Sequence, residues 1–269
     1  MLTDKTLPVS RTLTTCPNEK RPAAENPIPI GPSRFYGNGS DYFRQRVYEL
    51  LVGPVTTLCY DTALNYFHDN AVVLDVGIGN GFMIPRYHAL IKSKGLRIVG
   101  VDISTTALEQ CAERIRSYGL EDHIELHQAS IEDFKPQSFR QFDYIFFSMT
   151  FMLLEDQKGV LDRIRQMISR KGEIVFFQTM HTKNLPLMNF LKPKLKYLIG
   201  IDFGAVSYQK SFLKLLKERR MTVKEYRLLQ KTWFQGEYRI IIASPEPRSG
   251  ARHFHAPAPR HFGDALSAS

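Results

Sequence analysis

The sequence predicts an α/β protein built on a doubly wound, mostly parallel sheet of seven strands, closed by an antiparallel final hairpin. Three observations predict this fold class. A β-branched apolar run at 71–75 leads into a glycine-rich turn. Strand-like and helix-like segments then alternate, which favours parallel strands joined by helices. The run FDYIFFS at 142–148 is almost wholly apolar, as is typical of a strand buried on both faces.

The segments ahead of the first strand have a different character. Residues 1–33 contain six prolines and little apolar periodicity, which predicts a disordered or loosely draped arm. Residues 34–70 are expected to form a helical lid. Within this lid we predict two helices, at 42–51 and 55–67, separated at Gly53-Pro54 because proline disrupts a helix interior.

Residues 71–243 are expected to form one continuous domain. Its predicted strands cover 71–75, 96–101, 123–127, 142–148, 173–179, 222–229 and 232–243. Its predicted helices cover 83–92, 104–119, 156–169 and 208–219. Residues 180–207 interrupt the alternation as an apolar and basic insertion on the substrate side. Residues 244–269, rich in Pro, Ala, Gly and His, are predicted to be a disordered tail.

The turn after the first strand carries the clearest motif. Asp75 stands two residues before the first of three alternating glycines, Gly77, Gly79 and Gly81. Glycine admits backbone conformations closed to other residues and leaves room for ligand atoms. A dinucleotide turn, G-x-G-x-x-G, would need glycine in place of Phe82, and the Lys-Ser or Lys-Thr of a P-loop does not follow. The spacing therefore predicts a nucleotide-like ligand held by a D-x-G-x-G-x-G turn.

A second acidic residue ends the second predicted strand. Asp102 follows Gly77 by 25 residues. A carboxylate at the tip of this strand can accept hydrogen bonds from both hydroxyls of a ribose. Together the two motifs favour a site for a nucleoside-containing cofactor. A glycine turn that serves only the fold would not need the acid at the end of the second strand.

These motifs resemble those of the class I S-adenosylmethionine-dependent methyltransferases of the small-molecule and lipid type. The resemblance covers about 71–243 and includes the FDYIFF strand and the GEIVFF strand after the Lys-Gly turn. It implies a Rossmann-like fold and S-adenosyl-L-methionine as the cofactor. It also implies that the three glycines lie against the methionine part, that Asp75 helps to hold its amino group, and that Asp102 takes the ribose.

The resemblance further implies an adenine site near the second and third strands. Ile103 would pack on the adenine. Ser130 stands where the family often has an acidic residue, and its hydroxyl or the backbone NH of Ile131 would meet the ring. A plain helix cap at Ser130 is an equal alternative. Ser148 ends the fourth strand and is expected at the cofactor site.

Methyl transfer is an in-line displacement at a sulfonium, so the protein mainly positions the acceptor atom about 3 Å from the methyl carbon. A general base is needed only for an acceptor that is protonated at neutral pH. His181, just after the fifth strand, is the best-placed candidate, and a surface histidine without a role is the alternative. Tyr36 and Asp61 are candidates to line the pocket. The sequence shows no constellation of metal ligands.

Composition narrows the class of protein. Cys16, Cys59 and Cys111 are far apart and odd in number, which favours a reducing compartment, and we expect a cytoplasmic protein. No apolar run approaches the roughly 18 residues of a membrane-spanning helix.

The net charge of +9 is concentrated between Arg163 and Arg239, where 17 Lys or Arg oppose 5 Asp or Glu. Such a surface can attract nucleic acid, anionic lipid or an anionic substrate.

The class of acceptor is predicted from two observations: the sequence lacks the motifs of two methyltransferase groups, and it carries the insertion at 180–207. The sequence SMTF at 148–151 stands where N6-amino methyltransferases carry [DN]-P-P-[YFW], and the double-glutamate loop of arginine methyltransferases is missing. The insertion favours a small-molecule or lipid-like acceptor, with peripheral membrane contact through 190–199. Two alternatives stay open: an RNA methyltransferase that uses the basic half, and a cofactor-binding module without turnover. Nucleic acid is the less favoured partner, and no oligomeric state is indicated.

Overall fold

The structure, a computed structural model, describes residues 39–136, 141–181, 208–231 and 236–246, with the backbone alone for 39–52. These residues form a seven-stranded sheet in the order β3-β2-β1-β4-β5-β7-β6. The strands are β1 (Val72–Val76), β2 (Arg97–Asp102), β3 (Ile124–Gln128), β4 (Phe142–Ser148), β5 (Ile168–His181), β6 (Met221–Lys231) and β7 (Gly236–Pro245). Strands β1 to β5 pair in parallel, and β7 runs antiparallel to β5 and β6. The predicted fold class is confirmed.

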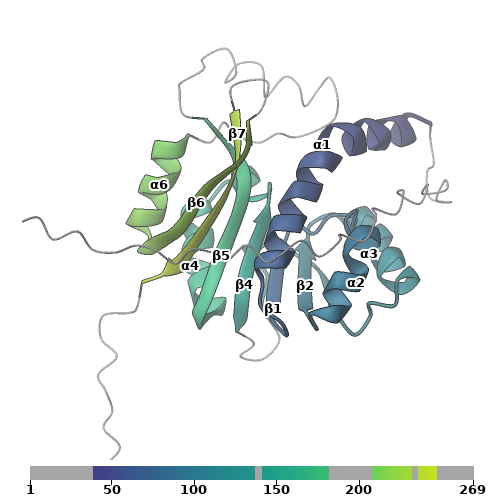
Figure 1. Ribbon diagram of the computed structural model, residues 1–269, viewed down its shortest axis with the longest axis horizontal. Coiled ribbons are helices and arrows are strands. Elements are labelled where there is room, and N and C mark those ends of the chain that lie inside the picture. Colours follow the sequence, from purple (N-terminus) through teal and green to yellow (C-terminus); the bar gives the residue numbers. More distant parts are fainter. Residues whose placement is uncertain (1–38, 137–140, 182–207, 232–235, 247–269) are drawn as a thin grey trace, which may run out of the picture.

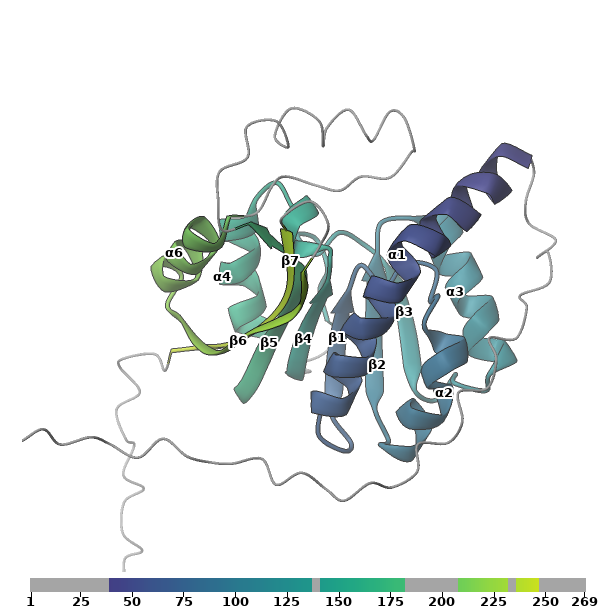
Figure 2. The ribbon, with the colours of Figure 1, turned by 45° about the horizontal axis from the view of Figure 1, so that its top comes forward.

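Helices cover both faces of the sheet (Figures 1 and 2). They are α1 (Gly39–Tyr66), α2 (Ile84–Ser93), α3 (Thr105–Ser117), the 3-10 helix η1 (Phe151–Leu153), α4 (Gln157–Met167) and α6 (Gln209–Glu218). Helices α1, α2 and α3 pack on one face, and α4 and α6 on the other. On β4, Phe146 belongs to the first core and Ile145 to the second. Successive side chains of a central strand point into the two cores in turn, which explains why these strands are apolar along most of their length.

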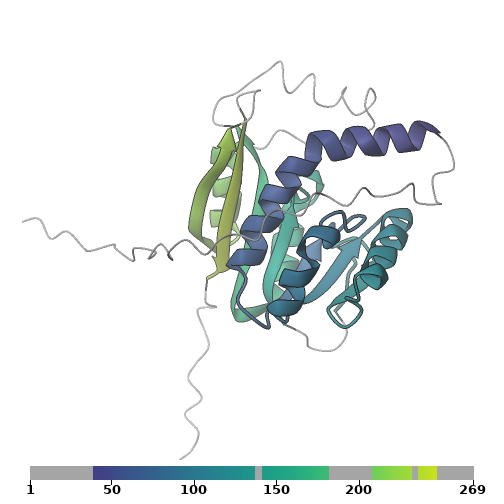
Figure 3. The same ribbon diagram turned by 45° about the vertical axis from the view of Figure 1, so that its right-hand side comes forward.

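Helix α1 corrects one prediction. It is a single helix that includes Pro54, and not two helices separated at Gly53-Pro54. The helix bends sharply along its length (Figure 3), as expected where a proline ring collides with the preceding turn. A proline in a helix interior costs about 3 kcal/mol. Burial of Val55 and Leu64 in the core of this face offsets this cost, since a fully buried aliphatic side chain contributes about 1.5–3 kcal/mol.

The carboxyl end of α1 is held by a lysine from a distant part of the chain. The Lys94 ammonium donates to the backbone oxygen of Leu64 at 2.9 Å and to that of Phe67. The last carbonyls of a helix have no partner within it and carry partial negative charge, so a cation there is stabilising. Lys94 follows α2, and this contact therefore ties α1 to α2.

Two predicted boundaries differ from the structure. Strand β5 begins at Ile168, directly after α4, and continues to His181. Its early start is allowed by Gly172, because a side chain there would place a Cβ 2.8 Å from the Phe142 carbonyl oxygen. The predicted insertion at 180–207 thus begins inside the sheet, and β7 extends past residue 243 to Pro245.

Three predicted segments fall largely outside the described residues: the arm at 1–33, residues 182–207 of the insertion, and the tail from 247 onward. Among the helices that the structure describes, none is long and apolar enough to span a membrane. Within the same residues, no group of three or more His, Cys, Asp or Glu side chains is placed to hold a metal ion.

Candidate functional site

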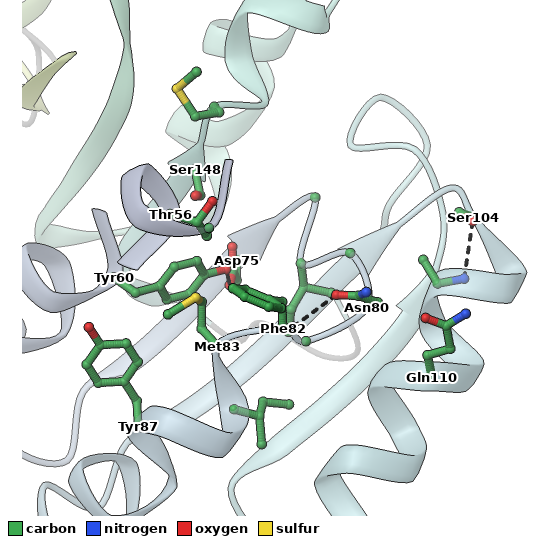
Figure 4. A pocket seen from close by; sticks show the side chains of 18 of the residues that line it. Thr56, Tyr60, Asp75, Asn80, Phe82, Met83, Tyr87, Ser104, Gln110 and Ser148 are labelled. Carbon is green, nitrogen blue, oxygen red and sulfur yellow. Dashed lines mark hydrogen bonds between the residues drawn. The ribbon is translucent and has the colours of Figure 1, made fainter. Parts of the chain in front are cut away.

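A cavity of about 410 Å³ lies at the carboxyl end of β1, between α1, α2 and the start of α3 (Figure 4). The strand order reverses between β1 and β4, and doubly wound sheets bind ligands in the crevice at this point. The volume is in the range of small-molecule sites. The cavity is lined by Gly53, Thr56, Tyr60, Leu64, Asp75, Gly77, Ile78, Gly79, Asn80, Gly81, Phe82, Met83, Ile84, Tyr87, Ile91, Ser104, Thr106, Ala107, Gln110, Ser148 and Met149.

The glycine-rich turn forms one wall. Gly77 has a φ of 79°, and a Cβ on it would lie 2.2 Å from the Thr150 side chain. Gly79 has a φ of 60°, but nothing lies within 4 Å of the position its Cβ would take. Gly77 is therefore required by close packing, whereas Gly79 shapes the turn and leaves open space for a ligand.

Asp102 ties this turn to the start of α3. One carboxylate oxygen accepts from the Gly79 backbone NH at 2.9 Å, and the other accepts from the Ser104 NH at 2.9 Å. Each oxygen keeps a further lone pair, because a carboxylate offers about four acceptor sites. Asp102 can thus fix the turn and still accept hydrogen bonds from a ligand.

Asp75 is the charged residue of the cavity wall. It is 3% exposed, and the Tyr60 hydroxyl donates to its Oδ2 at 2.8 Å. Its Oδ1 is buried and has no hydrogen-bond partner among the described residues. Burial raises the pKa of Asp75 to about 7; the Tyr60 hydrogen bond opposes the rise, and the charge of Asp102 adds to it. The carboxylate is therefore poised to receive a cationic group.

The remaining wall comes from α1 and from the end of β4. Thr56, Tyr60 and Leu64 recur every four residues along α1 and face the cavity together. Ser148 lies opposite, with its Oγ 3.4 Å from the Cys59 sulfur. Met149 has a φ of 61°, a left-handed conformation that is unusual for a side chain other than glycine and often marks a functional site.

Sequence reasoning missed Thr56 and Tyr60. The four-residue spacing on α1 could have indicated them, but the same helix carries a second stripe, Val55, Cys59 and Ala63, which is buried on the sheet. Asn80 and Gln110 were also missed. Asn80 stands between Gly79 and Gly81, so the glycine turn could have indicated it, whereas the sequence around Gln110 gives no signal of a ligand.

The predicted cofactor residues are only partly brought together. Asp75, the three glycines of the turn and Ser148 line the cavity, and Asp102 contacts it through Gly79. Ile103 is beside Asp102 with 73% of its surface exposed, and it lies outside the cavity lining.

Ser130 and Ile131 also lie outside the lining. The Ser130 hydroxyl donates to Asp133 Oδ2 at 2.9 Å and accepts from the Asp133 backbone NH at 3.1 Å. The Ile131 side chain is buried in the core on the α4 face. Ser130 thus closes a local turn, and the adenine contacts expected of both residues stay predictions.

Neither of the two predicted catalytic residues that the structure describes, His181 and Asp61, lines the cavity. His181 is 2% exposed at the end of β5, where it pairs with Gly236, and it is outside the lining. Asp61 is an exposed residue next to Tyr60 on α1 and is also outside the lining. Tyr36 lies outside the described residues. Their catalytic roles stay predictions.

A glycine-rich turn and an acid-tipped second strand, meeting at the switch point of a doubly wound sheet, define a nucleoside-cofactor site of the Rossmann-like class. A family model described as a methyltransferase domain matches residues 67–228. The chain belongs to this family. It is a class I S-adenosylmethionine-dependent methyltransferase, and its cofactor is S-adenosyl-L-methionine.

Curated relatives include carboxy-S-adenosyl-L-methionine synthases. The enzyme of Shewanella oneidensis is 24% identical over 215 residues, which cover 76% of this chain and 86% of that protein. The enzyme of Shewanella halifaxensis is 24% identical over 131 residues, 49% of this chain and 54% of that protein. The chain therefore matches only about half the length of the Shewanella halifaxensis enzyme.

Solved structures share the fold. Geranyl diphosphate C-methyltransferase from Streptomyces coelicolor A3(2) superposes with a TM-score of 0.56 and 12% identity, over 80% of this chain and 86% of that chain. A geranyl diphosphate methyltransferase in complex with S-adenosylmethionine gives 0.57 and 14%, over 78% and 92%.

The residues of the cavity fit the cofactor. The buried Oδ1 of Asp75 has no partner among the described residues and suits an ammonium group. The open space at Gly79 leaves room for ligand atoms against the main chain, and Asp102 has acceptor capacity left for a ribose.

Proposed function

We propose that this protein transfers a methyl group from S-adenosyl-L-methionine to a small-molecule or lipid-like acceptor in the cytoplasm. The observation that carries the proposal is the cavity itself. It lies between a helix and the sheet, and apolar or neutral polar side chains line it apart from Asp75. The cofactor takes up part of this space, and the lining carries no lysine or arginine among the described residues that would hold a polymer of phosphates.

The cofactor supplies a methyl group on a sulfonium, and the residues of the chain bind and orient it. Asp75 accepts from the amino group, and the glycine turn lies along the methionine part. Asp102 accepts from the ribose hydroxyls. Ile103, whose side chain is exposed next to Asp102, covers the adenine. Ser130 and the backbone NH of Ile131 contact the adenine ring from the loop after β3.

The acceptor occupies the end of the cavity formed by α1 and β4. Thr56 and Ser148 offer neutral hydroxyls there, and Met149 offers an apolar surface. These groups orient an acceptor and exclude water, which is the main contribution a methyl transfer requires. His181 is the candidate base for an acceptor that must lose a proton, and Asp61 and Tyr36 are candidate acceptor contacts from the helical lid.

An RNA acceptor is less well supported. The described basic residues of the second half lie mainly on α6, on β6 and in the turn between them, and β6 is the edge strand far from the cavity. Several of them are paired with carboxylates, as in Arg219–Asp162 at 2.9 Å and Lys224–Glu173 at 2.6 Å. A phosphate track that leads to the cavity is therefore not formed by these residues.

A structural neighbour gives one example of a lipid-like acceptor. The structurally similar geranyl diphosphate enzyme binds an apolar chain with an anionic head group. In this chain, an acceptor of that kind would match the apolar and basic residues predicted at 190–199, which would also make the peripheral membrane contact.

The cofactor site is tested by titrating S-adenosylhomocysteine into the wild type and into Asp102→Asn. We expect affinity to fall at least about tenfold in the variant, because a charged acceptor of the ribose is lost. Asp122→Asn, a change at an exposed aspartate, is the control and should bind like the wild type. Equal affinity of all three proteins would contradict the assigned site.

The acceptor is tested by incubating the protein with methyl-labelled cofactor and separate pools of small metabolites, lipids and RNA. Label is expected in the small-molecule or lipid pool. Label confined to RNA, with RNA binding that weakens steeply as salt rises, would replace the proposal by the RNA alternative.

A further inference from the structure

One hydrogen bond joins the amino-terminal helix to the glycine-turn strand at the cavity. The Tyr60 hydroxyl, on α1, donates to Asp75 Oδ2 on β1 at 2.8 Å. Both residues line the cavity, and Figure 4 shows the Tyr60 ring reaching from α1 toward Asp75. The same ring packs edge-on against Phe146 of β4, with centroids 5.3 Å apart. The sheet and the hydroxyl contact together hold the ring in one orientation.

The hydrogen bond leaves Asp75 with one oxygen for a ligand. Oδ2 is engaged by Tyr60, whereas Oδ1 is buried with no partner among the described residues. A buried carboxylate oxygen without a donor is unfavourable, because it has lost its hydrogen bonds to water and gained none from the protein. Because Asp75 lines the cavity, a cationic donor in the ligand would supply the missing partner.

The groups that act on Asp75 leave its negative charge without a cationic partner among the described residues. Tyr60 and Cys59 approach from α1, Asp102 from β2, and Cys111 from α3. Burial and the charge of Asp75 raise the pKa of Tyr60 well above its ordinary value, so its hydroxyl stays protonated and acts as a donor. None of these four groups carries a positive charge, and the two acids repel each other.

We propose that Tyr60 is a positioning residue that fixes Asp75 to receive the amino group of the cofactor, so that α1 is part of the cofactor site. The proposal rests on the assignment of the cavity to S-adenosylmethionine. The hydroxyl orients the carboxylate and favours its ionised form, and the ligand's ammonium takes Oδ1. Ligand binding and the docking of α1 against the sheet then support each other.

Two ligands separate this role from simple packing. S-adenosylhomocysteine carries the amino group, whereas 5′-methylthioadenosine keeps the nucleoside and the sulfur but lacks the amino acid. Both are titrated calorimetrically into the wild type and into Tyr60→Phe, which preserves the ring against Phe146. We expect the variant to bind S-adenosylhomocysteine about tenfold more weakly or worse and methylthioadenosine with unchanged affinity.

The pH profile supplies a readout that lost packing would not move. The affinity for S-adenosylhomocysteine should rise with pH as Asp75 ionises, and the midpoint of that rise should be higher in Tyr60→Phe, because the hydrogen bond that favours the anion is gone. In an Asp75→Asn background, Tyr60→Phe should have much less effect, since the two residues act as a unit.

Tyr66→Phe is the matched control. Tyr66 is on the same helix, and its hydroxyl also ties α1 to the sheet, through Glu173 Oε2 at 2.5 Å, but it lies outside the cavity lining. This variant should bind both ligands like the wild type. Equal losses for the two ligands in Tyr60→Phe, or an unchanged pH profile, would overturn the positioning role. A wild type that binds neither ligand would instead refute the cofactor site.

Discussion

At the scale of single residues, the buried carboxyl group of Asp75 serves ligand binding but lowers the stability of the ligand-free protein at neutral pH. Its carboxyl group is buried beside Tyr60, and its pKa is raised to about 7, against an ordinary value near 3.8. Between these pH values the folded protein keeps a proton that the unfolded chain has lost. The stability of the ligand-free protein should therefore fall as pH rises from about 4 to about 7 and then level off.

The variant Asp75→Asn should remove this pH-dependent loss. We expect the ligand-free variant to unfold at a higher temperature than the wild type at about pH 8, and the difference to shrink toward pH 5. Its affinity for S-adenosylhomocysteine should fall at least about tenfold. Thermal unfolding followed by circular dichroism at several pH values measures the first effect. The same pH dependence in both proteins would show that Asp75 is not the responsible group.

At the scale of elements, α1 depends on partners outside itself. The helix contains Pro54, so its own backbone does not account for its continuity. Its second half is held by the buried stripe on the sheet and by Lys94 at its carboxyl end. The cavity is built from the ends of β1 and β4 and from the helices α1 and α2. These contacts keep α1 in place against the other three elements.

Replacing Lys94 by methionine should loosen this arrangement. The aliphatic part of the side chain is kept, but the carbonyls of Leu64 and Phe67 lose their cationic donor. We expect a loss of about 1–2 kcal/mol in the free energy of unfolding, measured by urea denaturation. Lys135→Met, at an exposed lysine outside the helices, is the control and should change stability by less than about 0.5 kcal/mol. Equal effects of both variants would refute the capping role.

The elements themselves could largely be predicted from the sequence. Apolar runs such as FDYIFFS and the helix starting after Ser104 follow from local patterns, and Ser104 does accept from the Ala107 NH at the predicted cap. The separation predicted at Gly53-Pro54 was wrong, since tertiary packing overrides a local signal when enough apolar surface is buried. The early start of β5 was missed because it depends on pairing with Phe142.

At the scale of the whole molecule, the cavity and the described basic residues are separated. Strand β6 is three positions from β4 in the sheet, which at about 4.8 Å per strand amounts to about 14 Å. This exceeds the Debye length of about 8 Å at physiological salt. Helix α6 packs on the face of the sheet opposite α1, α2 and α3, which line the cavity. Charges on α6 and β6 should therefore have little influence on ligands in the cavity.

The double variant Lys210→Ala/Lys217→Ala tests this separation. Both side chains are on exposed positions of α6. We expect the affinity for S-adenosylhomocysteine and the rate of methyl transfer to a small acceptor to stay within about twofold of the wild type at physiological salt. A large loss of transfer would indicate that the acceptor is drawn along the basic surface, as the RNA alternative requires.

The sequence by itself determined the fold class, the cofactor and the two acidic residues at the ends of β1 and β2. These features are local, because a strand followed by a glycine turn or an acid is encoded within a few neighbouring residues. Only the tertiary structure decided that Tyr60 meets Asp75, that Ile131 turns into the core on the α4 face, and that His181 and Asp61 lie outside the cavity lining. Such distances depend on how helices pack against the sheet, and a local pattern does not contain that information.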